Sequence, residues 1–331
     1  LNEAGYRVAQ EESEADAIVV NTCCFIHDAK EESVETILEM AEWKKKGRLK
    51  ALIVTGCMAQ RYQDEIQQEI PEVDATTGYT EIVPILDEIL AEAEASQKEA
   101  EVEEPKEKSF VNCCPSIDLL PASLADKRVV TTGGYTAYLK IAEGCNKRCT
   151  YCIIPYIRGH YRSFPMEDLL EEARKLAEGG VKELILIAQE TTVYGMDCYG
   201  RKALPELLTK LCEIEGIEWI RILYCYPIAV MKKEKKICHY LDIPIQHSED
   251  TILKRMGRRT NRAELISLVE KLRKEIPDIV LRTTLITGFP GETEEEFKNM
   301  VDFVDSMEFD RLGVFPYSAE EGTKAAEMDG Q

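Results

Sequence analysis

Short apolar runs alternate with segments of helical periodicity along most of this 331-residue chain, and this alternation limits the possible fold more than any other feature. A strand, then a helix, then another strand is typical of a parallel sheet. The sequence therefore predicts an N-terminal doubly wound parallel α/β domain over residues 1–95. Its strands are expected at 17–20, 51–55 and 74–78, and its helices at 33–46, from about residue 60, and at 82–95.

The same alternation restarts after residue 133. Six β/α steps predict a partial (β/α)6 barrel of the TIM type, in which chemistry lies at the carboxyl ends of the strands. Residues 96–108 are acidic without apolar periodicity and 109–132 are irregular, so 96–132 is interpreted as a linker between domains 1–95 and 133–331. The barrel strands are expected at 137–141, 183–187, 219–223, 241–245, 280–286 and 311–315, and its helices at 166–178, 204–213, 262–275 and 293–306.

Three cysteines with C-x3-C-x2-C spacing follow the first barrel strand: Cys145, Cys149 and Cys152. Thiolates on one loop can bind three irons of a 4Fe-4S cluster. A structural zinc site normally has four protein ligands, and no fourth cysteine follows at ligand spacing. The pattern favours a cluster whose fourth iron is open for chemistry. A zinc site completed by a distant histidine and an iron–sulfur electron carrier are the alternatives.

Polar residues also follow other barrel strands, at the point where each strand ends. Gln189 and Glu190 follow the second strand and Gln246 follows the fourth. Ile286 and Gly288 lie in the string TLITGFPGE, which spans the end of the fifth strand and the turn after it. Each of these residues alone more often forms a cap or a turn, but together they share one rim of the barrel. Their shared rim favours a functional role over a cap or a turn.

The cysteine loop, with Tyr151 before its last cysteine, resembles the signature of the radical S-adenosylmethionine (SAM) superfamily. The resemblance implies that the open iron binds the amino and carboxylate groups of SAM, and that one electron cleaves SAM to a 5′-deoxyadenosyl radical. Tyr151 is assigned to the same cofactor, although a packing role fits the sequence equally well. The remaining contacts that the resemblance implies are the SAM amino group for Gln189 and Glu190, the ribose for Gln246, and the adenine for Ile286 and Gly288.

Nearly the whole chain resembles the methylthiotransferases, which join a radical SAM barrel to an α/β domain that binds a second 4Fe-4S cluster. The resemblance implies that Cys23 and Cys57, at the ends of the first two strands, are two of the three ligands of that cluster. The family's first ligand would precede Leu1, and its all-β substrate-binding module would follow Gln331. We therefore expect both to be absent from this chain, so the second cluster would have to assemble without the family's first ligand.

The other cysteines have no ligand spacing that the family supports. Cys24 is a possible substitute ligand, although a buried neighbour is the simpler interpretation, and Cys113 and Cys114 are further candidates without family support. Residues 226–236 are shorter than in the family, so a local distortion of the barrel is expected there. Buried thiols are expected at Cys198, Cys212, Cys225 and Cys238.

Two branches of this family differ in substrate. One methylthiolates an adenosine of tRNA, and the other methylthiolates the β-carbon of an aspartate in ribosomal protein uS12. Residues 152–159, 194–200, 223–227 and 242–247 resemble the uS12 branch. The formal net charge of −20 agrees with it, because an acidic protein repels tRNA and attracts a basic protein. The resemblance implies the uS12 reaction, with tRNA as the alternative substrate.

The expected partners follow from this interpretation. They are uS12 or the small ribosomal subunit, and an electron donor such as flavodoxin or ferredoxin; direct nucleic-acid binding is not expected. No apolar run approaches the roughly 18 residues that a membrane span needs, so a cytoplasmic protein is expected. Candidates for binding carboxylates of SAM or substrate, with solvated surface charge as the alternative, are Arg158, Arg162, Arg258 and Arg259.

Overall fold

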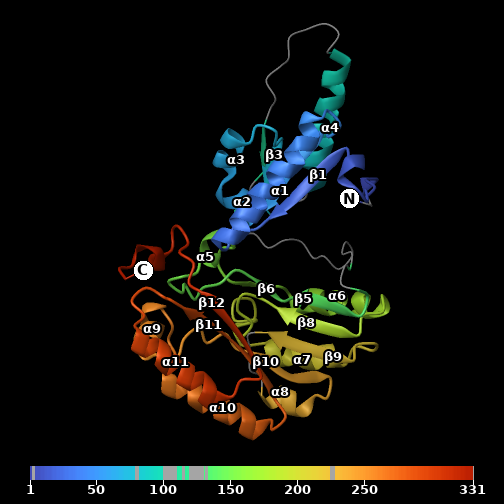
Figure 1. Ribbon diagram of the computed structural model, residues 1–331. Coiled ribbons are helices and arrows are strands. Elements are labelled where there is room, and N and C mark those ends of the chain that lie inside the picture. Colours follow the sequence, from blue (N-terminus) through green and yellow to red (C-terminus); the bar gives the residue numbers. More distant parts are fainter. Residues whose placement is uncertain are drawn as a thin grey trace. The chain divides into compact units, whose positions relative to one another are not determined.

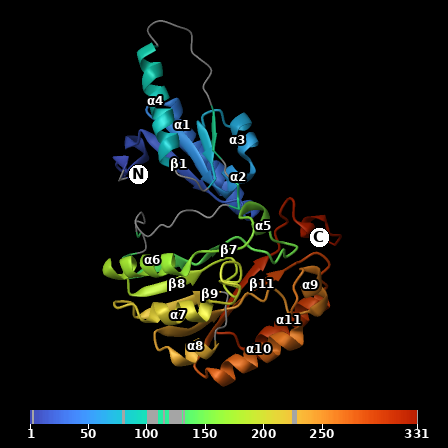
Figure 2. The same ribbon diagram turned by 180° about the vertical axis from the view of Figure 1, so that it is seen from behind.

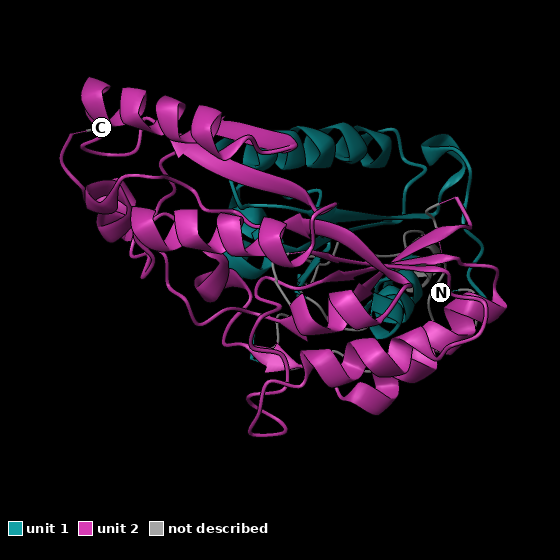
Figure 3. Cartoon of the chain, turned by 90° about the horizontal axis from the view of Figure 1, so that it is seen from below, with its two compact units in different colours: residues 1–121 teal, residues 122–331 magenta. Residues whose placement is uncertain are grey.

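The computed structural model describes residues 1, 4–78, 82–99, 110–113, 116–118, 130, 133–223 and 228–330. The chain divides into two compact units, Leu1–Pro121 and Ala122–Gln331, which Figure 3 distinguishes by colour. Among the described residues, none of the helices has both the length and the apolar character that a bilayer crossing requires.

The first unit contains a four-stranded parallel sheet in the order β1-β2-β3-β4. Every residue of β2 is buried, as expected for a strand covered on both faces. Figures 1 and 2, seen from opposite sides, show α1 and α4 on opposite faces of this sheet. The prediction of a parallel α/β domain is confirmed. Its elements are η2 (Glu12–Glu14), β1 (Ala17–Thr22), α1 (His27–Lys45), β2 (Ala51–Gly56), α2 (Cys57–Arg61), α3 (Gln63–Glu69), β3 (Ala75–Thr77), α4 (Ile82–Glu99) and β4 (Val111–Cys113).

The segment 96–132, interpreted above as a linker, has to be corrected. Helix α4 runs on to Glu99, and β4 pairs with β3 through the partners Ala75 and Val111. The first compact unit accordingly extends to Pro121. A three-residue strand is too short to show an apolar period, and β4 exists because β3 offers it an edge to pair with. Tertiary pairing of this kind leaves no signal in the local sequence.

The second unit contains a six-stranded parallel sheet in the order β12-β11-β10-β9-β8-β5. Strands β5 and β12 lie at its two ends and are not paired with each other, so the predicted partial barrel is confirmed. Its elements are β5 (Thr136–Lys140), β6 (Ala142–Glu143), α5 (Ile154–Ile157), β7 (Arg162–Ser163), α6 (Met166–Glu178), β8 (Glu183–Ile187), α7 (Leu204–Cys212), β9 (Trp219–Leu223), α8 (Ile228–Lys233), β10 (Ile237–Asp242), α9 (Asp250–Arg255), α10 (Arg262–Glu275), β11 (Val280–Thr287), α11 (Glu294–Met307), β12 (Arg311–Pro316) and η3 (Lys324–Glu327).

Strand β10 differs from its prediction at 241–245. It begins at Ile237, which pairs with Ile220 of β9, and the register shifts before Leu241. It ends before Pro244, which has no N–H to donate to a sheet ladder. This register shift lies within β10 and not in the segment 226–236, so the distortion expected in that segment stays a prediction. The segment 226–236 nevertheless contains a short helix, α8.

Helices α10 and α11 begin at capping boxes that the sequence encodes directly. The side chain of Asn261 accepts a hydrogen bond from the Glu264 N–H, and that of Thr293 accepts one from the Glu296 N–H. Both helices pack on β11 through a buried cluster that contains Leu265, Leu285 and Phe303. These contacts fix the segment after β11, which carries part of the candidate site (Figure 1).

Candidate functional site

The three-cysteine loop is closed at its base by a short antiparallel pair. Strand β6 pairs with β7, and the Cys145 N–H donates to the Gly159 carbonyl at 3.2 Å. Gly144 has φ +73°, and a Cβ at this position would lie 2.1 Å from the His160 carbonyl oxygen. Only glycine satisfies both constraints, so residue 144 is essential to the shape of the loop.

The thiols of Cys145, Cys149 and Cys152 are half-buried and free of disulfide bonds. The pKa of Cys152 is raised to about 12, mainly by burial and in smaller part by the negative charges of Cys149 and Cys145. Burial also raises the pKa of Cys145. The three thiols are therefore close enough to affect one another. Among the described residues, no three His, Cys, Asp or Glu side chains surround a position for a single metal ion.

The far side of the loop is attached to the turn after α9. The Thr150 N–H donates to the Met256 carbonyl at 3.0 Å, and the Thr150 hydroxyl donates to the Arg255 carbonyl at 2.9 Å. Tyr151 is half-buried and packs edge-on against Phe289, with ring centroids 6.5 Å apart. Burial raises the pKa of Tyr151. These contacts support the packing role for Tyr151.

Gln189 and Glu190 follow β8 but differ in their surroundings. Gln189 Oε1 is buried and has no hydrogen-bond partner among the described residues, so it is free to accept a donor. Glu190 is buried and forms an ion pair with Lys147 of the cysteine loop. Its Oε1 also accepts a hydrogen bond from the Thr192 N–H at 3.0 Å. In this structure Glu190 connects β8 to the cysteine loop.

Gln246 lies where the chain rejoins the sheet after β10. It has φ +74°, its N–H donates to the Thr284 carbonyl at 2.9 Å, and its carbonyl accepts from the Ile286 N–H at 2.8 Å. Gly288 follows β11 with φ +68°, and a Cβ there would meet no atom within 4 Å. The backbone of Gln246 thus positions Ile286, and the space beside Gly288 is open.

Glu292 holds these segments together, although its sequence context did not single it out as a site residue. Its side chain is 4% exposed, and its Oε1 lies 3.1 Å from Nε2 of the fully buried His247. Its Oε2 accepts from the N–H groups of Gly288 and Phe289. His247 Nδ1 accepts from the Glu249 N–H at 3.0 Å, so the ring proton must lie on Nε2. The signal that could have found Glu292 is its place four residues after Gly288 in TLITGFPGE.

Three of the four candidate arginines have partners inside the protein. Arg158 Nη1 lies 3.3 Å from Glu143 Oε1, Arg162 Nη2 donates to the Arg158 carbonyl at 3.1 Å, and Arg258 Nη2 donates to the Pro244 carbonyl at 2.8 Å. Arg259 is exposed. Arg158, Arg162 and Arg258 therefore stabilise the loops of this rim in the present structure.

In the first unit, the pairing of β1 with β2 brings the other cysteines together. Thr22 is the register partner of Gly56, so Cys23 and Cys57 follow at neighbouring strand ends. Cys23 is exposed, and its N–H donates to Ser33 Oγ at 3.1 Å. Cys24 is buried and hydrogen-bonds to the Cys57 thiol, which raises the pKa of Cys24. Cys24 therefore contacts Cys57, one of the two predicted ligands of the second cluster.

Several residues named from the sequence cannot be placed. Cys113 lies in β4, but its side chain is outside the described part of the structure. Cys114, Cys225 and the string 224–227, which includes Tyr226, also lie outside the described residues.

Comparison with known proteins gives two family matches. Residues 139–304 match the radical SAM superfamily, and residues 1–78 match the family described as Uncharacterized protein family UPF0004. The ribosomal protein uS12 methylthiotransferase RimO of Lachnoclostridium phytofermentans is 62% identical over 341 aligned residues, which cover 100% of this chain and 74% of that protein. RimO of Clostridioides difficile is 49% identical, over 98% of this chain and 72% of that protein.

Solved structures show a similar fold at low sequence identity. The radical SAM methyltransferase TsrM from Kitasatospora setae, with cobalamin and a 4Fe-4S cluster bound, has a TM-score of 0.62 and 15% identity, covering 93% of this chain and 65% of that one. The cobalamin-dependent radical SAM enzyme OxsB with aqua-cobalamin has a TM-score of 0.56 and 14% identity, covering 95% and 46%. At these identities the similarity concerns the fold alone.

Proposed function

Because the chain belongs to the RimO family of ribosomal protein uS12 methylthiotransferases, within the radical SAM superfamily, we propose that it replaces one hydrogen on the β-carbon of a uS12 aspartate with a methylthio group. Its cofactors are SAM and 4Fe-4S iron–sulfur clusters. The observation that carries the proposal is the loop at the carboxyl end of β5, which gathers three free, half-buried thiols.

Cys145, Cys149 and Cys152 are the proposed ligands of the catalytic cluster. Their donor set fits the group, because thiolates are the usual protein ligands of iron–sulfur clusters and three of them leave one iron without a protein ligand. When bound, the cluster supplies the electron that cleaves SAM and so creates the radical that removes hydrogen from an unactivated carbon. The protein's residues hold the cofactors in place and limit the access of water.

SAM is proposed to lie between the cysteine loop and the segments after β8, β10 and β11. The free Oε1 of Gln189 can accept a hydrogen bond from the SAM amino group, and this buried orphan acceptor supports the assignment. The open space beside Gly288 suits the close approach of a flat base to the backbone. Glu190, Gln246 and Ile286 complete the proposed set, with Glu190 acting through Lys147.

Cys23 and Cys57 are the proposed ligands of the second cluster. Their neighbouring strand ends support this role, and the hydrogen bond between Cys24 and Cys57 makes Cys24 the first candidate for a further ligand. Gly56 supports the close approach of these ends, because a Cβ there would lie 2.4 Å from the Thr22 carbonyl oxygen.

The proposed partners are uS12, free or in the small ribosomal subunit, and a one-electron donor of the flavodoxin or ferredoxin type. The net charge of −20 favours a basic protein over direct binding to nucleic acid. We place the reaction in the cytoplasm, where ribosomal proteins are found, and propose no role for a membrane.

The proposal is tested by incubating the protein with SAM, a reductant, sulfide and either uS12 or tRNA, followed by mass spectrometry. We expect a mass gain of one CH2S unit on a uS12 aspartate and none on tRNA. A Cys149→Ala variant should show no gain, whereas Cys212→Ala, a half-buried thiol on α7, should retain it. A gain on tRNA alone would overturn the uS12 assignment.

A further inference from the structure

The sheet of the second unit presents different chemistry on its two faces. Apolar residues at alternate positions pack in the core with α6 and α7, namely Leu184, Leu186, Ile220, Ile222, Leu241 and Leu281. The residues between them point to the opposite face. We call the polar part of this opposite face the inner face. It consists of Glu183, Arg221, Tyr240, Asp242, Arg282, Thr284, Arg311 and Gly313. The side chains of Arg221 and Arg282 are 33% and 32% exposed, so solvent reaches this surface.

Two ion pairs cross the inner face. Arg221 Nη2 lies 2.8 Å from Glu183 Oε1, and its guanidinium stacks 4.8 Å from the centroid of the Tyr240 ring. Arg282 forms an ion pair with Asp242 on the adjacent strand. Each arginine is thus neutralised by one carboxylate, and neither pair leaves a net charge.

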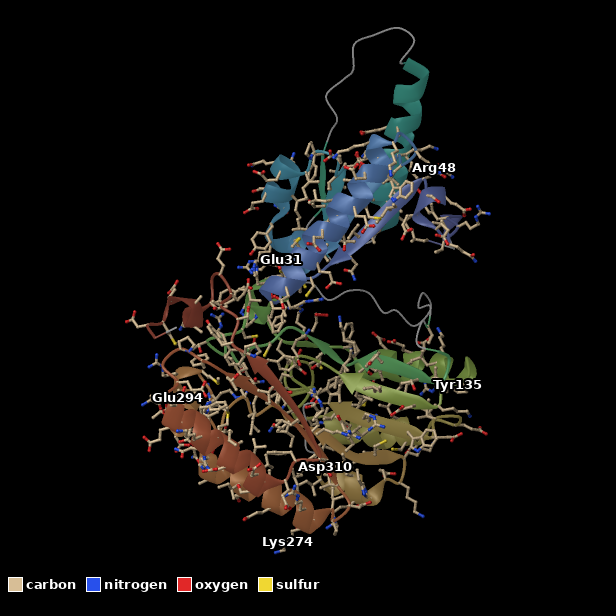
Figure 4. The ribbon with its side chains drawn as sticks, viewed as in Figure 1. Glu31, Arg48, Tyr135, Lys274, Glu294 and Asp310 are labelled. Carbon is tan, nitrogen blue, oxygen red and sulfur yellow. The ribbon has the colours of Figure 1, made fainter. Side chains whose placement is uncertain are left out.

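Arg311 adds a positive charge that these pairs do not balance. It is the register partner of Arg282, and β12 is aligned there because Oδ2 of Asp310, labelled in Figure 4, accepts from the Leu281 N–H at 2.8 Å. Arg311 is exposed, and the described part of the chain gives it no hydrogen bond or ion pair. Burial raises the pKa of Tyr240, and the charge of Arg311 is close enough to offset a small part of that rise.

Asp242 has an acceptor that the protein leaves unused. The residue is 4% exposed, and its Oδ2 is taken by Arg282. Its Oδ1 is buried and has no hydrogen-bond partner among the described residues. A buried acceptor without a donor is costly, so such an atom points to a donor that arrives with a ligand.

Gly313 leaves space beside Arg282. Its φ is not in the left-handed region, so the backbone does not require glycine there, and glycine inside a strand often marks the close approach of a ligand. A Cβ at this position would lie 3.4 Å from Arg282 Nη2, 3.7 Å from Thr284 Oγ1 and 3.3 Å from the Phe315 ring. A larger side chain would fill the space next to the guanidinium.

We propose that Arg282, Arg311 and the space at Gly313 bind the side-chain carboxylate of the substrate aspartate, and that Asp242 Oδ1 accepts an N–H of the substrate peptide. This site rests on the proposed function and supplies its specificity. Hydrogen is removed from the carbon next to that carboxylate, so the charge must be held close to the reacting atom. An unpaired carboxylate in a partly dry site is costly, and the guanidinium fork pairs with it in two parallel hydrogen bonds. In a chain of net charge −20, an unbalanced arginine supplies the needed local attraction.

The test measures binding of two fluorescent peptides that copy the modified segment of uS12, one with the aspartate and one with asparagine in its place. Fluorescence anisotropy gives Kd for the wild type, Arg311→Gln and Gly313→Val. Arg174→Gln, on the exposed side of α6, is the matched control. The wild type and the control should bind the aspartate peptide about ten- to a hundred-fold more tightly, as expected for a charge-assisted hydrogen bond. Both inner-face variants should reduce this preference to less than about threefold.

Circular dichroism spectra that match the wild type will show that each variant is folded. The inner-face site is overturned if folded Arg311→Gln and Gly313→Val keep the full preference for the aspartate peptide over the asparagine peptide. It is also overturned if the wild type modifies uS12 but shows no such preference. In both cases the proposed function stands. A wild type that neither binds nor modifies uS12 overturns both.

Discussion

Glu292 accepts hydrogen bonds from three donors, and two of them, on His247 and Phe289, belong to buried residues. The donors are His247 Nε2 at 3.1 Å and the N–H groups of Gly288 and Phe289. In Glu292→Gln, one carboxylate oxygen becomes an amide NH2 that faces a donor. The His247 ring cannot relieve this conflict by moving its proton to Nδ1, because Nδ1 faces the Glu249 N–H. One buried donor therefore stays without an acceptor.

An unsatisfied buried donor costs about 1–3 kcal/mol, so Glu292→Gln should lower the free energy of unfolding of the second unit by that amount. Glu292→Ala leaves the two buried donors, on His247 and Phe289, without an acceptor and should cost about 2–6 kcal/mol. With a urea m-value of about 2 kcal/mol/M, the Gln variant should unfold at a midpoint lower by about 0.5–1.5 M.

The assay is urea unfolding followed by tryptophan fluorescence. The chain has two tryptophans, so a Trp43→Phe background leaves Trp219 of β9 as the reporter of the second unit. Glu270→Gln, an exposed carboxylate on α10, is the control and should shift the midpoint by less than about 0.25 M. An unchanged midpoint for Glu292→Gln would refute the reasoning that this carboxylate satisfies buried donors.

Three further predictions concern the two cysteine sites. Gly144→Ala should disrupt the cysteine loop and lower iron incorporation far more than Gly134→Ala does. Both glycines have positive φ, but only at Gly144 would a Cβ collide with the backbone, at 2.1 Å. Equal iron contents in the two variants would contradict this prediction. In the cluster-free protein at pH 8, Cys152, with its pKa raised to about 12 by burial, should be thiolate in about one molecule in 10⁴. Its alkylation, followed by mass spectrometry, should speed up about tenfold per pH unit until about pH 12, and a plateau near pH 9 would show that burial does not raise its pKa. Ser33→Ala removes the acceptor of the Cys23 N–H and should destabilise the first unit by about 1–2 kcal/mol, read from Trp43 fluorescence. Thr36→Ala on the same helix, whose hydroxyl is exposed, should change stability by less than about 0.5 kcal/mol, and equal effects of the two variants would contradict a specific role for Ser33.

Local pattern predicted the elements that local forces decide. Strands β8 and β9 and helices α6 and α10 begin and end at the predicted residues, because each has an apolar period bounded by turn or capping residues. Pairing decided the elements that were missed or shifted. Strand β4 depends on the edge of β3, and β10 starts earlier than its apolar run because β9 pairs with Ile237.

The candidate site likewise has one part that the local sequence predicts and another that arises only from strand pairing. The spacing of Cys145, Cys149 and Cys152 is a local feature, and the structure gathers these thiols as the spacing indicated. Glu292 and His247 are 45 residues apart, so their contact arises only when β10 and β11 pair. The inner face has the same origin, since Asp242, Arg282 and Arg311 come from three strands and become neighbours through register.

The most direct test of the account is whether three cysteines of one loop support reductive cleavage of SAM. Anaerobically reconstituted protein, reduced with dithionite and supplied with SAM, is assayed for 5′-deoxyadenosine by liquid chromatography and mass spectrometry. We predict release by the wild type and by Cys212→Ala, and none by Cys145→Ala, Cys149→Ala or Cys152→Ala. Release of 5′-deoxyadenosine by any of these three loop variants at the wild-type rate would contradict the assignment of the catalytic centre.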